Sequence, residues 1–154
     1  MLTNLRQNPK PTIFLVDDDE DDRFLFLDAI KHLRSEIEFR EFVDGESFVK
    51  TLSSLQAPPD AIFLDLNLPK RNGIECLDYL RQQLGATLTK VFIISTSSST
   101  FMIEKTKERG ADFYIRKSEN FANLKRLIQI ALKQLNAPNT VEAVPYYLNQ
   151  LVEE

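Results

Sequence analysis

Short apolar runs alternate along the chain with longer amphipathic stretches. Thr12–Val16, Ala61–Leu64 and Val91–Ile94 are continuous apolar and β-branched runs, which is typical of strands that are buried on both faces. Ile37–Phe42 has polar residues between its apolar ends and predicts an edge strand, and Phe113–Ile115 predicts a short fifth strand. The pattern therefore predicts five strands, separated by segments long enough to hold helices.

A helix is predicted after each strand, because apolar residues recur there at helical spacing. Four of the five helices show this spacing clearly, at Phe24, Leu27, Ile30 and Leu33, at Phe48, Leu52 and Leu55, at Ile74, Leu77, Leu80 and Leu84, and at Phe121, Leu124, Leu127, Ile128, Ala131, Leu132 and Leu135. The remaining helix, from about Thr100 to Arg109, is weakly patterned and closes at Gly110. Asp44-Gly45 predicts a turn, and Pro58-Pro59 breaks the second helix.

Five strand–helix units in succession predict an α/β fold with a parallel sheet covered by helices on both faces. Right-handed crossovers restrict the topology. The leading arrangement is the doubly wound, flavodoxin-like strand order 2-1-3-4-5. Residues 12–135 are predicted to form this domain, residues 1–11 a flexible N-terminal arm and residues 136–154 a C-terminal extension.

The C-terminal extension has three interpretations, of which one is a disordered tail and the other two involve a short helix. It carries an apolar stripe with spacings of 3, 4 and 3 residues, at Val141, Val144, Leu148 and Leu151. Pro145 predicts the opening of a short helix from Tyr146 to Val152. This helix either docks on its own domain or forms a contact in a homodimer. The extension is too short for a folded DNA-binding domain.

Composition and charge exclude several classes of protein. With 154 residues, 43% of them hydrophobic and 27% charged, the chain is expected to be one globular domain. The single cysteine, Cys76, allows no intrachain disulfide, and this favours a cytoplasmic location. No apolar run approaches the roughly 18 residues of a membrane span. The net charge of −4 disfavours nucleic acid as a partner.

Polar residues stand where the predicted strands end. Asp17 and Asp18 follow the first strand, Asp65 the third, Ser95 the fourth, and Lys117 stands just beyond the fifth. Because ligands of doubly wound sheets bind beyond the carboxyl ends of the strands, the three carboxylates are expected to converge. Such a set favours a hard cation such as Mg²⁺. A hydroxyl and an ammonium beside it would hold a phosphoryl group, with Asp65 as the nucleophile.

In these residues the chain resembles the receiver domain of two-component response regulators. The resemblance covers residues 12–135. It is carried by motifs that occur in the right order: Ile13-Phe14-Leu15-Val16-Asp17-Asp18, Asp65-Leu66-Asn67-Leu68-Pro69 with Gly73, Ser95, and Tyr114-Ile115-Arg116-Lys117. Each motif is common by itself, but their order and their positions at strand ends are specific.

The resemblance implies a role for each matching residue. Asp65 would be the phosphoacceptor. The side chains of Asp18 and Asp65 and the main-chain carbonyl of Asn67 would bind Mg²⁺, while Asp17 would act on the metal through water. Lys117 would pair with the phosphoryl group.

The resemblance also implies a switch. Ser95 would be the hydroxyl that turns toward the phosphoryl group, and Tyr114 the aromatic residue that moves between outward and inward positions with it. Asn67 and Ser97 would influence dephosphorylation. The phosphoryl group would come from a sensor histidine kinase, of the phytochrome-type or hybrid class, and the signal would pass to a downstream protein partner. No enzymatic activity is expected beyond phosphotransfer and self-dephosphorylation.

Some features leave alternatives open. Ser118 stands where the family usually has a proline with a cis bond, and Thr96 competes with Ser95 for the switch position. Asp19–Asp22 are interpreted as helix-capping charges rather than as further metal ligands. The rival functions are a scaffold that never turns over phosphate and an aspartyl-phosphate phosphohydrolase. The latter usually has a general acid two residues after its nucleophile, where this chain has Asn67.

Overall fold

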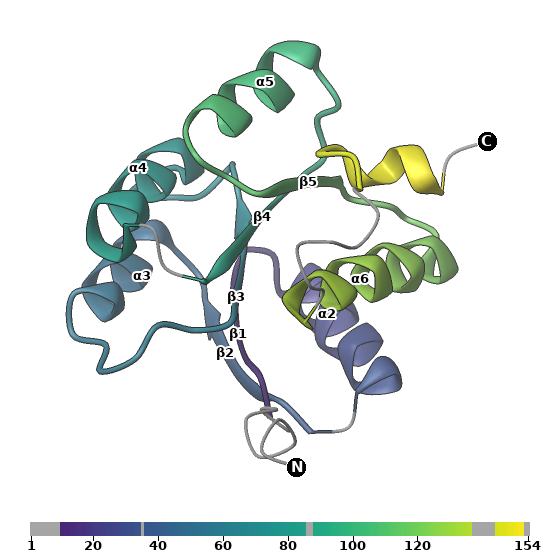
Figure 1. The fold of residues 1–154 in the computed structure, drawn as a ribbon, viewed down its shortest axis with the longest axis horizontal. Helices are drawn as coiled ribbons and strands as arrows, with labels where there is room; N and C mark the ends of the chain where they lie inside the picture. The colour runs from purple at the N-terminus through teal and green to yellow at the C-terminus, as the bar shows by residue number, and fades with distance from the viewer. Residues whose placement is uncertain (1–9, 35, 86–87, 137–143, 153–154) are drawn as a thin grey trace.

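The computed structural model describes residues 10–34, 36–85, 88–136 and 144–152 (Figure 1). The described residues form a five-stranded sheet in the order β2-β1-β3-β4-β5, with every neighbouring pair parallel. Its strands are β1 (Thr12–Val16), β2 (Glu38–Phe42), β3 (Ala61–Asp65), β4 (Lys90–Ser95) and β5 (Phe113–Arg116). The predicted fold class and strand order are therefore confirmed. The predicted N-terminal arm, except for residues 10 and 11, lies outside the described residues.

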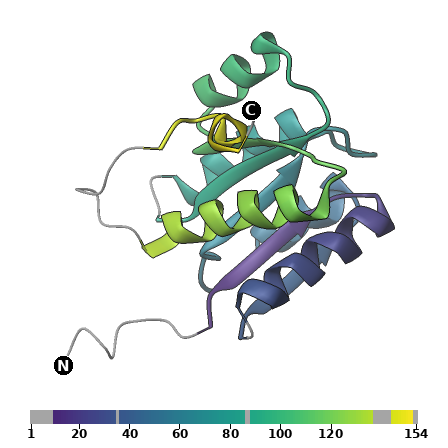
Figure 2. The same ribbon diagram turned by 90° about the vertical axis from the view of Figure 1, so that its right-hand side faces the viewer.

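Helices cover both faces of the sheet. On one face lie α2 (Glu20–Leu33) and α6 (Phe121–Asn136), which run side by side (Figure 2). On the other lie α3 (Gly45–Leu52), α4 (Gly73–Leu84) and α5 (Thr100–Glu108) (Figure 1).

Side chains that alternate along each strand divide the interior into two cores, because successive residues of a strand point to opposite faces. In β1, Phe14 and Val16 face the core under α3 and α4, whereas Ile13 and Leu15 face the core under α2 and α6.

The start and end of α3 differ from the prediction. Asp44-Gly45 forms no separate turn. The Asp44 side chain instead accepts a hydrogen bond from the Ser47 N–H at 2.7 Å and caps the helix, which begins at Gly45. A Cβ at Gly45 would lie 2.0 Å from the carbonyl oxygen of Arg71, so glycine is needed there for close packing. The helix ends at Leu52, so Leu55 packs against the core from beyond it.

The buried face of α2 also differs from the prediction. Phe24, which belongs to the predicted apolar spacing, is 69% exposed, whereas Ile30 of the same spacing is buried as predicted, together with Phe26 and Ala29. Phe26 contacts the Phe63 ring of β3 at a centroid distance of 4.7 Å. Asp19 caps the helix by accepting from the Asp22 N–H at 3.1 Å, which confirms the capping interpretation for this residue.

The described part of the C-terminal extension, residues 144–152, docks on its own domain. Only one 3-10 turn, η1 (Leu148–Leu151), forms in place of the predicted helix, and Tyr147 pairs with Tyr114 of β5. Leu148 is buried and Leu151 is 44% exposed, so the predicted apolar stripe does not lie on one face and was wrong. Leu148 and Val152 are the residues that pack into the core. Val141 lies outside the described residues, and the homodimer contact stays a prediction.

No helix within residues 10–34, 36–85, 88–136 and 144–152 has both the length and the apolar character needed to cross a membrane.

Candidate functional site

Three carboxylates meet at the carboxyl ends of β1 and β3, as the strand order predicts. Asp17 directly follows β1, and Asp65 is the last residue of β3, its neighbour in the sheet. Ligand oxygens of Asp17, Asp18 and Asp65 all lie within 4.8 Å of one another. Asp17 and Asp65 are buried and Asp18 is exposed, so the cluster opens to solvent on one side.

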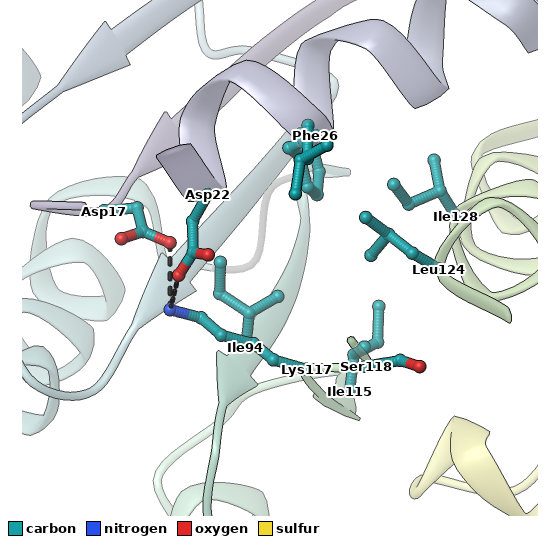
Figure 3. Close-up of a pocket in the computed structure, with 10 residues that line it drawn as sticks. Asp17, Asp22, Phe26, Ile94, Ile115, Lys117, Ser118, Leu124 and Ile128 are labelled. Carbon is teal, nitrogen blue, oxygen red and sulfur yellow. Dashed lines mark hydrogen bonds and ion pairs between the residues drawn. The ribbon is translucent and has the colours of Figure 1, made fainter. Parts of the chain in front are cut away.

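Lys117 places a positive charge among these acids. Its Nζ lies 3.0 Å from Asp17 Oδ2 and 2.9 Å from Asp65 Oδ2. A third carboxylate, Asp22 from the first turn of α2, has its Oδ2 2.9 Å from the same ammonium (Figure 3). The ion pairs with one ammonium offset the repulsion between Asp17 and Asp65 in a largely buried site.

Burial changes the proton affinities of this cluster. It raises the pKa of the Asp17 carboxyl to about 6, against the opposing effects of a hydrogen bond from the Asp19 N–H and the charge of Lys117. Burial acts to lower the pKa of Lys117, but the bonds to Asp22 and Asp65 outweigh it and raise that pKa above its ordinary value. Lys117 is therefore an ammonium at neutral pH.

We expect cation binding at this cluster to depend on pH. Below pH 6 most Asp17 carboxyl groups are protonated, and the negative charge that would attract a divalent cation is lost. The Kd for Mg²⁺ should therefore be about tenfold higher at pH 5 than at pH 7.5. Calorimetric titration of Mg²⁺ at the two pH values measures this ratio, and Asp17→Asn should flatten it. A Kd that is the same at both pH values in the wild-type protein would contradict the raised pKa.

The same shift links pH to folding in the metal-free protein. The pKa of Asp17 is higher in the folded chain than its ordinary value of 3.8. Its contribution to stability is therefore fully present below about pH 4 and is lost as the pH rises through 6.

Ser95 and Tyr114 are linked through the backbone of Ser97. Ser95 is buried at the end of β4 while Thr96 is exposed, so Ser95 is the hydroxyl in the interior. Ser95 Oγ accepts from the Ser97 N–H at 3.1 Å. Tyr114 is fully buried and donates its hydroxyl to the Ser97 carbonyl oxygen at 2.9 Å. Asn67 is exposed, and its backbone N–H donates to Asp65 Oδ1 at 3.1 Å.

Asp22 is the residue that the sequence reasoning missed. The sequence predicts only a favourable charge at a helix N-terminus, whereas the Asp22 side chain accepts a hydrogen bond from Lys117, 95 positions further along the chain. The available signal was its place in the first turn of a helix that begins at the carboxyl end of β1. The Lys117–Ser118 bond is trans, since no peptide bond among the described residues is cis.

A cavity of about 50 Å³ lies between α2 and α6, and Lys117 is one of the residues that line it (Figure 3). Its walls are mainly apolar and include Phe26, Ile94, Ile115, Leu124 and Ile128, with the Asp17, Asp22 and Lys117 side chains at one end. The apolar walls limit the exposure of Lys117, whose side chain is 20% exposed.

The chain is similar to known signalling proteins. A family model described as "Response regulator receiver domain" matches residues 13–129. Response regulator Rcp1 of Synechocystis sp. is 29% identical over 127 residues, which cover 79% of this chain and 86% of Rcp1. The DNA-binding transcriptional activator EvgA of Escherichia coli is 28% identical over 135 residues, which cover 86% of this chain and only 61% of EvgA.

Solved structures agree with these matches. The Mn²⁺-bound form of response regulator Rcp1 is 27% identical with a TM-score of 0.73, over 86% of this chain and 99% of that one. The phosphorylated cyanobacterial phytochrome response regulator RcpA is 28% identical with a TM-score of 0.74, over 87% of this chain and 99% of that one.

Proposed function

This chain belongs to the family of response regulator receiver domains, and from this premise we propose that it is a switch controlled by phosphorylation of Asp65. The observation that carries the proposal is the position of Lys117, whose Nζ lies within 3.0 Å of both Asp17 and Asp65 at the ends of adjacent strands. One ammonium beside a buried carboxylate can neutralise charge on an incoming phosphoryl group.

The acidic cluster fits a divalent cation, because its donors are oxygens and their charges exceed that of Lys117. Asp18 and Asp65 would hold Mg²⁺ together with the main-chain carbonyl of Asn67, and Asp17 would act through water. The bound ion would neutralise charge on the phosphoryl oxygens. The similarity to Rcp1, which has been solved in an Mn²⁺-bound form, supports the binding of a divalent cation.

In the proposed reaction, an Asp65 oxygen attacks the phosphorus of a phosphohistidine on the donor. The new O–P bond forms as the N–P bond to the histidine breaks, and an acyl phosphate results. Lys117 then transfers its contact from Asp65 to a phosphoryl oxygen, and the Ser95 hydroxyl donates to another. Tyr114 is connected to these changes because its hydroxyl donates a hydrogen bond to the carbonyl oxygen of Ser97, two residues after Ser95.

The proposed donor is a sensor histidine kinase. The similarity to the phytochrome response regulator RcpA favours a kinase of the phytochrome type. The output would be a contact with a downstream protein partner, and activity would be limited to phosphotransfer and self-dephosphorylation, influenced by Asn67 and Ser97. The proposal places the protein in the cytoplasm, and the free, buried Cys76 thiol agrees with a reducing compartment.

Phosphorylation by a small molecule tests this function. The protein is incubated with acetyl phosphate, with and without Mg²⁺, and analysed by intact mass and by size-exclusion chromatography with light scattering. We expect a single phosphoryl adduct that requires Mg²⁺, and a shift from monomer to dimer would identify dimerisation as the output. Absence of the adduct together with absence of Mg²⁺ binding would refute the switch and favour a scaffold that never turns over phosphate.

A further inference from the structure

We propose that residues 144–152, here called the strap, stabilise the phosphorylated state by holding the Tyr114 side chain against the loop that carries Ser95. The inference rests on the proposed function and adds a means of regulating the same site. It is carried by three sets of contacts, which join the strap to β5, the strap to the Tyr114 ring, and Tyr114 to the site.

The strap occupies the outer edge of β5, where it lies alongside the strand (Figure 1). The Tyr114 N–H donates to the Tyr146 carbonyl oxygen at 2.8 Å. The Asn149 side chain accepts from the Arg116 N–H at 2.7 Å and donates to the Arg116 carbonyl oxygen at 3.1 Å. Asn149 is only 3% exposed, so its amide acts as the peptide group of a neighbouring strand would.

The strap also encloses the Tyr114 ring. The rings of Tyr146 and Tyr147 lie 6.4 and 6.0 Å from it between centroids, and Tyr114 has no exposed surface. The Tyr146 hydroxyl shares a hydrogen bond of 2.7 Å with Thr106 of α5, and this bond holds the Tyr146 ring in place beside Tyr114. An outward movement of the Tyr114 ring past these two rings requires the strap to move.

On its other side Tyr114 is connected to the acidic site. Its hydroxyl donates to the Ser97 carbonyl oxygen, and the Ser97 N–H donates to Ser95 Oγ. The Lys117 N–H donates to the Ser95 carbonyl oxygen at 2.8 Å, so the loop and the phosphoryl-pairing lysine are joined as well. Tyr114 therefore lies between the strap and the groups that would contact a phosphoryl group.

This arrangement predicts that docking of the strap and binding of a phosphoryl group favour each other. With the strap docked, Tyr114 keeps one position, in which it holds the Ser95 loop next to the site. The conformational freedom of this loop is then restricted before phosphorylation, so a phosphoryl group should bind a docked protein more tightly than an undocked one. By reciprocity, a bound phosphoryl group should hold the strap more firmly on β5.

The test uses the full chain with Mg²⁺ and beryllofluoride, a non-covalent mimic of the phosphoryl group. Asn149→Ala removes both bonds to Arg116, and Gln150→Ala, an exposed neighbour in the same turn, is the matched control. We expect Asn149→Ala to bind beryllofluoride at least about 5-fold more weakly than the wild type, within the usual range of coupling between sites, and Gln150→Ala to match the wild type.

Hydrogen–deuterium exchange at the Tyr114 and Arg116 amides reports the strap itself, and thermal unfolding confirms that each variant is folded. Exchange should be faster in Asn149→Ala, and beryllofluoride should slow it in the wild type. Equal or tighter beryllofluoride binding in Asn149→Ala, with exchange already faster, would overturn the coupling and leave the proposed function intact. A wild-type protein that binds no beryllofluoride would overturn both.

Discussion

The Asp65→Asn variant is expected to gain no phosphoryl group from acetyl phosphate under conditions in which the wild-type protein gains one. An amide is not a nucleophile toward phosphorus, so the acyl phosphate cannot form. The substitution also removes the negative charge that Asp65 places beside Lys117 and in the cation site, while it nearly preserves the shape of the side chain. Complete loss of the mass shift in intact-mass analysis is the expected result.

Asp21→Asn is the matched control for this prediction. Asp21 is an exposed acid in the first turn of α2, close in sequence to the cluster but not among its three candidate ligands. It should keep the adduct at wild-type yield. An adduct of undiminished yield in Asp65→Asn would show that another residue accepts the phosphoryl group.

The Gly73→Ala variant is expected to lose both stability and phosphorylation. A Cβ at Gly73 would lie 2.3 Å from the carbonyl oxygen of Asp65 and 2.5 Å from the Cα of Leu66, distances that only a backbone shift can relieve. Such overpacking costs about 1–3 kcal/mol or more in the free energy of unfolding. Because the clash is with the backbone of Asp65 itself, the carboxylate should move relative to Lys117, and the rate of phosphorylation should fall more than tenfold.

Leu80→Ala separates these two effects. Leu80 is fully buried in the same helix, and its truncation should cost about 2–5 kcal/mol without a clash at Asp65. Chemical denaturation measures the stability of both variants, and acetyl phosphate measures their phosphorylation rates below the unfolding transition. If Leu80→Ala and Gly73→Ala slow phosphorylation equally, reduced stability alone would account for the loss.

The sequence determined the sheet and the ends of its strands. Continuous apolar runs report strands buried on both faces, and the first polar residue after each run marks where the strand leaves the interior. The convergence of Asp17, Asp18 and Asp65 then followed from parallel topology, because the strands before them are neighbours in the order 2-1-3-4-5. These inferences need only the local sequence pattern and the rule that crossover connections between parallel strands are right-handed.

Only the tertiary structure decided the contacts that depend on how the helices and the C-terminal segment are oriented. The rotation of α2 buries Phe26 instead of Phe24 and directs Asp22 to Lys117. The strap lies along β5 because Asn149 satisfies the backbone of Arg116 while Leu148 fills the core, although the stripe through Leu148 and Leu151 suggested another face. Periodicity records which residues are apolar, but it carries no information about the side on which a distant segment packs. The side on which such a segment packs is decided by how closely the two surfaces fit together in the folded protein.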